Sequence, residues 1–239
     1  MPPRFSGLTA LVAGGTGGLG RAVSRAFLEE GGSVVVTYRK QDEFAALKKD
    51  AGALASKLSG HTVDVTDETQ VREFVDQIIR DHGKLDVLVN TVGAFAGGTK
   101  LWEADSRVFD TMLALNLRSG FVLSKYVVPA MLKQKHGSIV NIASKAAVEH
   151  AAGAFAYVAS KAAAVAMMDS LAEDLKGTGV RVNSVLPSII DTEANRQAMP
   201  KADFAKWPKP EEIAKVVLFL CSEDAKVIHG AAIPVYGNQ

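Results

Sequence analysis

The chain has 239 residues, of which 48% are hydrophobic and 22% are charged, and its formal net charge at pH 7 is +1. This composition is typical of a packed globular protein and excludes an intrinsically disordered chain. So small a net charge gives no long-range attraction for nucleic acids or anionic membranes, so we expect neither as a partner.

The cysteine count and the apolar runs bear on the compartment. Cys221 is the single cysteine, so no intrachain disulfide can form, as is usual in a reducing compartment. No apolar run approaches the roughly 18 residues of a membrane span. The apolar segment that follows residues 1–7 is too short for the core of a signal peptide. We therefore expect a soluble, cytoplasmic protein.

Apolar runs alternate with helical patterns along the first half of the chain. We expect a strand over Leu8–Ala13, a helix over Leu19–Glu30 and a strand over Ser33–Thr37. Thr62–Val65 is interpreted as the third strand and Thr66 as the N-cap of the next helix. That helix carries an apolar stripe with helical spacing, at Val71, Phe74, Val75, Ile78 and Ile79.

The same alternation continues to the end of the chain. We expect strands over Leu85–Asn90, Ser138–Ile142, Val180–Leu186 and Ala232–Tyr236, and helices over Arg107 to about Met131, Tyr157–Lys176 and Pro210–Cys221. Strands that alternate with helices predict βαβ units and a parallel sheet covered on both faces. The fold class is therefore α/β, a Rossmann-type doubly wound parallel sheet. With no linker or repeat in the sequence, residues 1–239 are expected to form a single dinucleotide-binding and catalytic domain.

A glycine-rich turn follows the first strand, where such a sheet binds its ligands. Its residues are Gly14, Gly15, Thr16, Gly17, Gly18, Leu19 and Gly20. Glycines let the backbone approach a pyrophosphate, whose charge then faces the free N–H groups of the next helix. The glycines fit either G-x-G-x-x-G or a longer G-x-x-x-G-x-G pattern. The alternative is a βα turn that binds no ligand.

The end of the second strand bears on the choice of cofactor. NAD-binding chains usually carry an Asp or Glu there for the ribose 2′-hydroxyl, whereas this chain has Tyr38, Arg39 and Lys40. A guanidinium can hold a 2′-phosphate through several donors. We therefore expect NADP(H) to be preferred over NAD(H), the alternative being that both cations are ordinary surface charges.

Tyr157 and Lys161 are the candidate proton-transfer pair, because residues four apart lie on one helix face. A nearby ammonium is expected to lower the pKa of the tyrosine from about 10. Ser144 follows a strand, where its hydroxyl can bind a substrate oxygen. Asn116, a polar group within an apolar helix, is either a hydrogen-bonded core amide or the holder of a water molecule against Lys161.

In these motifs the chain resembles the short-chain dehydrogenase/reductase family over essentially its full length. The matching positions are Gly14–Gly20, Asp64, Asn90 with Gly93, Asn116, Ser144, Tyr157 and Lys161. The resemblance implies that Asp64 and Val65 bind the adenine end and that Asn90 supports the cofactor loop. It also implies that Lys161 binds the nicotinamide ribose, and that Pro187, Ser188, Ile190 and Thr192 lie near the nicotinamide.

The chain departs from the usual pattern of that family at three places. Ala13 stands where a Thr is usual, Thr91-Val92 replaces Asn-Ala, and Ser188 replaces Gly. The first two remove or change contacts that brace the loops, and the third adds bulk near the nicotinamide. None of them removes a proton donor.

Two segments are similar to a narrower member of the family, quinonoid dihydropteridine reductase. These are the glycine-rich loop Asn90–Gly98 and the stretch Asp191–Trp207. That enzyme lacks a serine at the place of Ser144 and carries an Asp after its second strand. We therefore expect a reductase of ketones or other carbonyl compounds, with pterin reduction as the alternative and a non-catalytic, cofactor-binding regulator as a further one.

The candidate substrate pocket contains Ser144 and a set of mostly aromatic side chains, Phe95, His150, Phe155, Met199 and Trp207. Core packing is an equally good account of Phe95 and Trp207, and His150 fits a polar loop residue. Scattered histidines and a single cysteine predict no metal site. Small residues on the helix that holds Tyr157 permit close helix approach, and the family resemblance then implies a homotetramer.

Overall fold

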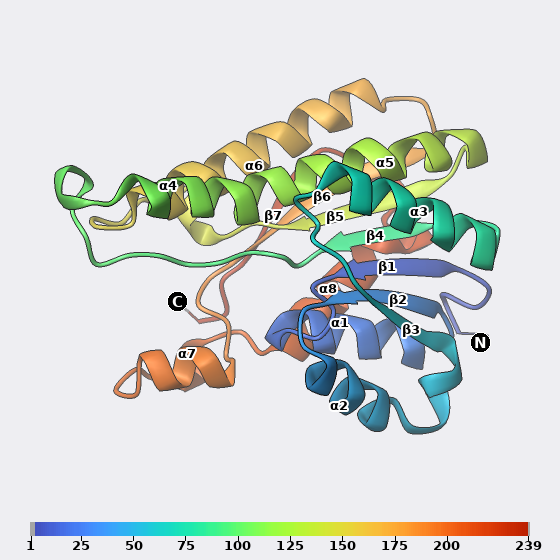
Figure 1. Ribbon diagram of the computed structural model, residues 1–239, viewed down its shortest axis with the longest axis horizontal. Helices are drawn as coiled ribbons and strands as arrows, with labels where there is room; N and C mark the ends of the chain where they lie inside the picture. Colours follow the sequence, from blue (N-terminus) through green and yellow to red (C-terminus); the bar gives the residue numbers. More distant parts are fainter. Residues whose placement is uncertain (1–2, 239) are drawn as a thin grey trace.

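The computed structural model describes residues 3–238, which form a seven-stranded parallel sheet. The strands lie in the order β3-β2-β1-β4-β5-β6-β7 (Figure 1). Their bounds are β1 Thr9–Ala13, β2 Ser33–Tyr38, β3 Leu58–Thr62, β4 Val87–Asn90, β5 Gly137–Ile142, β6 Val180–Pro187 and β7 Ala231–Val235. The predicted fold class is confirmed. Residues 1, 2 and 239 of the expected domain lie outside the described residues.

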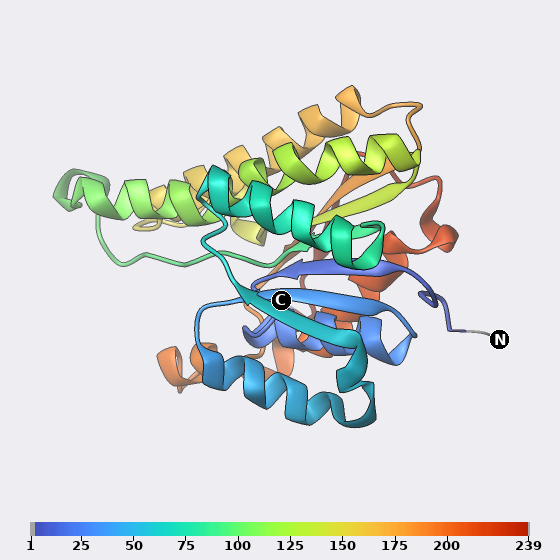
Figure 2. The ribbon, with the colours of Figure 1, turned by 45° about the vertical axis from the view of Figure 1, so that its right-hand side comes forward.

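Helices cover both faces of this sheet. They are α1 Gly18–Glu29, α2 Gln41–Ala51, α3 Glu68–His82, α4 Ser106–Leu113, α5 Ser119–Gln134, α6 Phe155–Asp174, α7 Glu193–Ala198 and α8 Pro210–Cys221. Helices α3, α5 and α6 lie on one face, and α1, α2 and α8 lie on the other (Figures 1 and 2). The sequence did not lead us to expect α2 and α7.

Successive side chains along each strand point to opposite faces of the sheet and pack into two hydrophobic cores, one on each face. Leu11 and Leu88 pack beneath α3 and α5, whereas the neighbouring Val12 and Val89 pack against α1 and α8. All five residues of β1 are buried. Strands buried on both faces are expected to be continuously apolar, as these are. The central strands are thereby held rigidly, and the loops at their carboxyl ends are positioned by that rigidity.

The expected third strand, Thr62–Val65, is wrong. The strand is Leu58–Thr62, which pairs with β2 from Val34 to Tyr38. It lies at the edge of the sheet and its sequence, LSGHT, carries one buried apolar residue, Leu58. With no alternation to mark it, the more apolar stretch after it was the stronger signal. Asp64 still follows the strand, as expected.

Helix α3 is capped by Asp67 and not by Thr66, which corrects a second expectation. The carboxylate of Asp67 accepts from the backbone N–H groups of Thr69 and Gln70, at 2.8 and 3.0 Å. The hydroxyl of Thr66 instead donates to the carboxylate of Asp64 at 2.7 Å. A carboxylate at an N-cap also interacts favourably with the helix dipole, which favours Asp67 over a neutral threonine.

The strand order reverses between β1 and β4, and that is where a doubly wound sheet binds its ligand. Two segments project past the carboxyl ends there, the long connection after β4 and the region around α7 (Figure 1). In residues 3–238, none of the helices has the length and apolar character needed to cross a membrane.

Candidate active site

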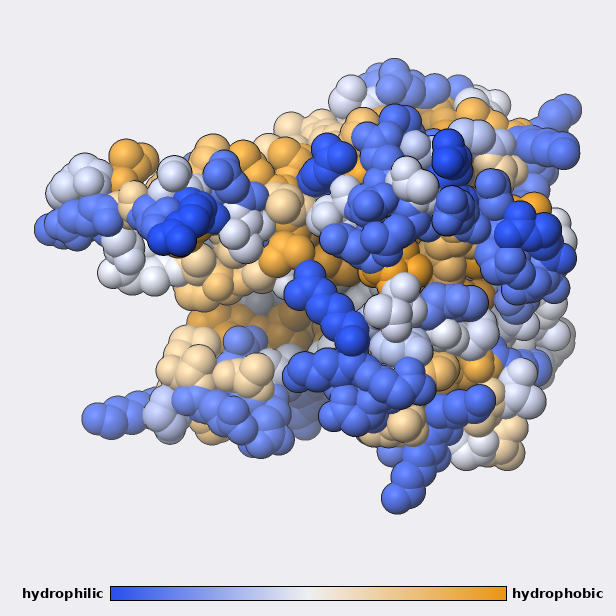
Figure 3. Space-filling model, in the orientation of Figure 1, coloured by the Kyte–Doolittle hydropathy of each residue, from blue (hydrophilic) through white to orange (hydrophobic). Residues whose placement is uncertain are grey.

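A cavity of about 670 Å³ lies beyond the carboxyl ends of β4, β5 and β6. Its walls come from the segment after β4, the segment before α6 and the segment after β6, including Ala94, Ser144, Tyr157, Lys161, Pro187 and Met199. In the space-filling view the surface is hollowed between the two projecting segments, and the floor of the hollow is apolar (Figure 3). Three of the four predicted catalytic residues, Ser144, Tyr157 and Lys161, line this cavity, whereas Asn116 is not among its lining residues.

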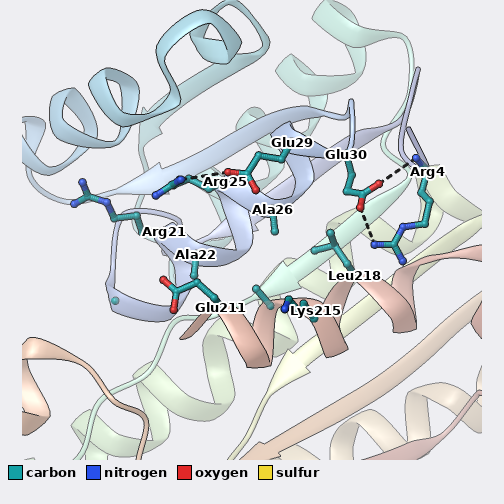
Figure 4. Close-up of a pocket in the computed structure, with 12 residues that line it drawn as sticks. Arg4, Arg21, Ala22, Arg25, Ala26, Glu29, Glu30, Glu211, Lys215 and Leu218 are labelled. Carbon is teal, nitrogen blue, oxygen red and sulfur yellow. Dashed lines mark hydrogen bonds and ion pairs between the residues drawn. The ribbon is translucent and has the colours of Figure 1, made fainter. Parts of the chain in front are cut away.

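A smaller cavity of about 330 Å³ lies between α1 and α8 (Figure 4). Its charged side chains are largely paired, Arg4 with Glu30 at 2.9 Å and Arg25 with Glu29 at 3.2 Å. Arg21 is paired with Asp50 on α2. Because these pairs neutralise one another and no candidate proton donor lies there, the larger cavity is the candidate active site.

The glycine turn after β1 is so tightly built that most of its glycines have no room for a side chain. A Cβ atom on Gly20 would lie 2.1 Å from the carbonyl oxygen of Gly14, and one on Gly18 would lie 2.8 Å from the methyl of Thr192. Gly14 itself has φ +74°, which favours glycine. Gly17 has ordinary room. The steric demands thus fall on Gly14, Gly15, Gly18 and Gly20, since a Cβ atom on Gly15 would lie 2.4 Å from the Val36 side chain. The room at Gly17, which the shorter pattern requires as a glycine, favours the longer pattern.

Two threonines brace this turn and compensate for the departures at 13 and 91. The Thr91 hydroxyl donates to the carbonyl of Ala13 at 2.7 Å and approaches that of Gly14 at 3.2 Å. From the other side, the Thr37 hydroxyl accepts from the Gly14 N–H at 2.8 Å. The loop-bracing contacts are therefore changed but not lost.

The end of β2 carries two cations with different surroundings. Lys40 forms an ion pair with Glu43 at 3.2 Å, and the same carboxylate accepts from the Thr16 hydroxyl at 3.1 Å. Arg39 is exposed, and its charge helps to lower the pKa of Asp64, although the Thr66 hydrogen bond is the larger cause. Tyr38 donates to Gln41. Within residues 3–238, Arg39 thus forms none of the ion pairs, whereas Lys40 is paired with Glu43.

Asn90 links the loop after β4 to the sheet and to α5. Its amide nitrogen donates to Asn141 at 3.0 Å, and its oxygen accepts from the Val92 N–H at 3.2 Å. Asn90 and Asn141 are neighbours in the β4–β5 register. This buried side chain holds the loop after β4 against the sheet.

Asn116 lies in a widened, π-helical turn between α4 and α5, a feature that is frequent at functional sites. Its side-chain oxygen accepts from the Ala94 N–H at 2.8 Å and its nitrogen donates to the Ala94 carbonyl and to Ser160, each at 3.0 Å. A Cβ atom on Gly93 would lie 2.8 Å from that oxygen and 3.2 Å from Lys161 Nζ. Gly93 thus keeps open a space that both polar groups border.

Ser144 and Tyr157 present their hydroxyls to the cavity from different elements. Ser144 follows β5, its oxygen accepts from the Ala146 N–H at 3.1 Å, and its hydroxyl hydrogen-bonds with Tyr157. Burial raises the pKa of the Tyr157 hydroxyl above 10.0, while hydrogen bonding with Ser144 acts in the opposite direction. Lys161 is not among the causes of this shift, so the lowering of the pKa that we expected from it is wrong, and Tyr157 holds its proton at neutral pH.

Lys161 is 5% exposed, and its ammonium donates to the carbonyl of Ile142 at 2.9 Å. Burial lowers the pKa of Lys161 from 10.5 to about 8, because the charged form loses hydration that one carbonyl does not replace. At pH 7 the group is still mostly protonated. It is a buried cation within the wall of the cavity.

The segment after β6 forms the opposite wall. Pro187, Ser188 and Ile190 line the cavity, and Thr192 caps α7 while packing its methyl against the glycine turn. The Ser188 hydroxyl donates to the carbonyl of Tyr236 at 2.8 Å. Its extra bulk relative to glycine is therefore turned toward the last strand, where the hydroxyl finds a partner.

The predicted pocket residues divide into two groups. Phe95, Ser144 and Met199 line the cavity. The other three do not line it. His150 is exposed, and Trp207 is buried beside Phe204, with 6% of its surface exposed. Phe155 lines a separate cavity. Sequence reasoning missed the ion pair of Lys145 and Glu149, at 3.1 Å, both of which line the cavity. The available signal was that Lys145 and Glu149 carry opposite charges and lie four residues apart, directly after Ser144.

The residues at this edge fit a nicotinamide dinucleotide. Gly17 caps α1 without a side-chain hydrogen bond, so the first N–H groups of that helix are free for a pyrophosphate. Leu19 and Lys161 border the same cavity, which extends from the glycine turn to the hydroxyl pair. In residues 3–238 there is no group of three or more His, Cys, Asp or Glu side chains that could hold a metal ion.

Comparison with known proteins gives consistent matches. The family model described as short chain dehydrogenase matches residues 8–203. A 3-oxoacyl-[acyl-carrier-protein] reductase of Thermotoga maritima is 32% identical, and the alignment covers 98% of each chain. A meso-2,3-butanediol dehydrogenase of Serratia marcescens is 33% identical, over 98% of this chain and 95% of that one.

Solved structures agree in fold and differ in cofactor. The structure of ElxO with NADP bound has a TM-score of 0.91 at 27% identity, covering 96% of this chain and 97% of that one. NAD+-bound xylitol dehydrogenase has a TM-score of 0.89 at 27% identity, covering 98% of this chain and 99% of that one.

Replacing Lys161 by Met should stabilise the protein at pH 7 while it removes activity. A pKa that falls from 10.5 to about 8 on folding means that folding at pH 7 opposes protonation by up to about 3 kcal/mol. The penalty is full below pH 8 and disappears as pH rises toward 10.5, where the unfolded chain also loses its proton. Urea unfolding at pH 7 and pH 10 measures the difference. Lys145→Met is the control, and a Lys161→Met protein less stable than wild type at pH 7 would contradict the account.

Proposed function

This chain belongs to the short-chain dehydrogenase family and is thus an oxidoreductase acting on CH–OH or C=O groups; we propose that it is an NADPH-dependent reductase of ketones and α-dicarbonyl compounds. The reverse reaction is an alcohol dehydrogenation. The observation that carries the proposal is the meeting of Ser144, Tyr157 and the buried Lys161 in one cavity. An intact set of these groups argues against a non-catalytic, cofactor-binding regulator.

The two hydroxyls divide the work on the substrate oxygen. Bound NADPH would supply the hydride to the carbonyl carbon. Ser144, whose hydroxyl interacts with Tyr157 while no substrate is bound, donates a hydrogen bond to the carbonyl oxygen, where negative charge develops. Tyr157, protonated because burial raises its pKa, transfers its proton to that oxygen. Together they turn the carbonyl into an alcohol.

Lys161 and Asn116 return the proton to Tyr157. A water molecule in the space beside Gly93 would accept from Lys161 Nζ and donate to the free lone pair of the Asn116 oxygen. The Asn116 side chain, clamped by two hydrogen bonds to Ala94, is fixed for that purpose. Lys161 also reaches the nicotinamide ribose in this proposal. Both roles of Asn116 considered from the sequence, core amide and water holder, are compatible.

The preference for NADP(H) rests on the end of β2. The engaged Lys40 has its charge neutralised by Glu43, so Arg39 is the cation left to bind a 2′-phosphate. The absence of an acid at 38–40 removes the usual acceptor for an NAD ribose hydroxyl. The Thr16 hydroxyl donates to the same Glu43 carboxylate. In this proposal Asp64 and Val65 lie beside the adenine of the cofactor.

The substrate half of the cavity suits uncharged molecules. Of its charged lining residues, Lys145 and Glu149 neutralise each other, and Lys161 is assigned to proton transfer. The relative that is named for butanediol acts on a small uncharged diol, which supports this class.

Pterin reduction is the second candidate, because Gly97, Gly98 and Asn195 line the cavity. Against it, Arg196 is bound to Asp191 through both of its carboxylate oxygens, at 2.5 and 2.8 Å. The guanidinium also packs over the Phe204 ring and lies outside the cavity lining. Arg196 therefore holds the Asp191–Trp207 stretch together and is not available to bind a pterin.

A homotetramer of this chain is part of the proposal. Helix α6 carries Ala162, Ala163 and Ala166 at its partly or fully exposed positions, where small side chains allow a second helix to approach closely. Light scattering at micromolar concentration should give a mass about four times 25.3 kDa. A species at 25.3 kDa alone would contradict the oligomer.

Tyr157→Phe should reduce kcat by about 10²–10⁴-fold, because it removes the acid that protonates the substrate oxygen. Binding of NADPH, measured by fluorescence titration, should change little since the ring remains. Tyr126→Phe is the matched control, because the Tyr126 hydroxyl donates to Glu68 away from the cavity. A Tyr157→Phe enzyme with near-normal kcat at pH 7 would remove Tyr157 from the mechanism.

Arg39→Ala should raise KM for NADPH by about tenfold or more, and KM for NADH far less, because charge-assisted hydrogen bonds contribute roughly 1.5–3 kcal/mol. Lys40→Ala is the neighbouring comparison and should have a clearly smaller effect, since Lys40 is held by Glu43. Steady-state kinetics with both cofactors measures this. Wild-type enzyme that uses NADH better than NADPH would refute the assignment.

The substrate class is tested by kcat/KM for a panel of ketones, α-dicarbonyl compounds, quinones and quinonoid dihydropterin with NADPH. We expect ketones or α-dicarbonyl compounds to lead and the pterin to be reduced weakly or not at all. Specificity is the ratio of these constants. A pterin that exceeds every carbonyl compound by more than about tenfold, roughly 1.4 kcal/mol, would reverse the order of the two candidates.

A further inference from the structure

Phe95 occupies an unusual position for a large apolar side chain. It is 70% exposed, although burial would remove much of its ring from water at a gain in free energy. Its ring meets the Tyr157 ring edge-on, with centroids 5.0 Å apart and planes at 76°, a favourable aromatic geometry. Packing in the core does not explain the position of this side chain, whereas its contact with Tyr157, the proposed proton donor, does.

A second cavity of about 340 Å³ lies on the far side of Phe95. Phe95 and Gly97 line both this cavity and the candidate active site. The other lining residues of the second cavity come from the connection after β4, from α4, and from the start of α6 with the turn before it. Its walls combine polar groups with the apolar side chains of Val108, Phe155 and three alanines, and Asp105 turns its carboxylate to the Arg107 N–H at 2.8 Å.

Glycines give the Phe95 ring its place between the two cavities. A Cβ atom on Gly97 would lie 2.7 Å from the Phe95 ring, and Gly98 has φ +89°. Gly153, with φ +75°, brings the turn before α6 close to the backbone at Gly98, 3.5 Å from the position of a Cβ atom. The two segments are thus in contact at Gly98 and Gly153, and the Phe95 ring borders the space on either side.

We propose that Phe95 is a specificity-determining partition: its ring separates the active-site cavity from the second cavity and so limits how far a ketone can extend past Tyr157. This inference rests on the proposed carbonyl reduction and deepens it. Substrates of the wild-type enzyme are then compact on the Phe95 side of the carbonyl, and bulk is accommodated on the side of Ile189 and Met199. Removing the ring joins the two cavities, and the second one accepts an apolar substituent.

The test compares two ketones that differ by one phenyl ring, butan-2-one and 4-phenylbutan-2-one. The quantity measured is the ratio of kcat/KM for the longer ketone to that for the shorter one, with NADPH. Phe95→Ala should raise this ratio at least tenfold over wild type, and Phe95→Trp should not raise it. A ratio that stays within twofold of wild type in Phe95→Ala would overturn the partition.

A double variant identifies where the phenyl ring goes. Ala104 lines the second cavity alone and is half-buried in extended backbone, so Ala104→Phe fills that cavity. Combined with Phe95→Ala, it should return the ratio to near the wild-type value. Glu103→Phe places the same ring on the neighbouring residue, which lines neither cavity, and should leave the Phe95→Ala gain in place. A gain that survives Ala104→Phe would show that the phenyl ring binds elsewhere.

Binding measurements separate a failure of the partition from a failure of the proposed function. If wild type reduces neither ketone nor any carbonyl compound of the panel, carbonyl reduction is refuted, whereas the Kd of 4-phenylbutan-2-one by ligand-observed NMR still tests the cavity. Phe95→Ala should tighten that Kd several-fold, and adding Ala104→Phe should reverse the change. An unchanged Kd in Phe95→Ala, with or without turnover, would overturn the inference.

Discussion

A protonated amine lies inside this protein with one carbonyl oxygen as its hydrogen-bond partner, and the site is arranged around that fact. The ammonium of Lys161 is held by Ile142 at the end of β5, so its position depends on the central strands being rigid. The charge is expensive to bury, as the fall of its pKa to about 8 records. The open space at Gly93 and the clamped amide of Asn116 adjoin it. Because its burial costs free energy, this ammonium contributes little to the stability of the fold. Its position is better explained by hydrogen bonds that it donates to bound groups.

Local patterns predicted most of the fold because each element carries its own signal. The apolar runs, the stripe on α3 and the glycine turn could all be recognised within a few residues of sequence. The third strand was misplaced because LSGHT has one buried apolar residue, and its pairing with β2 comes from tertiary contact. The Asp67 cap was missed for a subtler reason, since Thr66 and Asp67 are both good caps and only the fold decides which begins the helix.

The candidate site was predictable as a set of residues but not as an environment. The sequence places Tyr157 four residues from Lys161 and suggests that the cation lowers the tyrosine pKa. Burial, which no spacing reveals, raises that pKa instead, and Lys161 is not among the causes of the shift. The relation of Phe95 to Tyr157 is equally hidden, because it depends on the connection after β4 meeting the turn before α6 about sixty residues later. Contacts between distant segments determine both results.

The two threonines that brace the glycine turn make two distant positions of the chain depend on each other. Thr91 and Thr37 already satisfy the Ala13 and Gly14 backbone from opposite sides. Ala13 is fully buried, so a threonine there, alone, adds a hydroxyl and a methyl group where the backbone hydrogen bonds are already made. An asparagine at position 91, alone, removes a brace that nothing at position 13 replaces. Residues 13 and 91 are therefore coupled, so the effects of changing both are not the sum of the single effects, although 78 positions separate them.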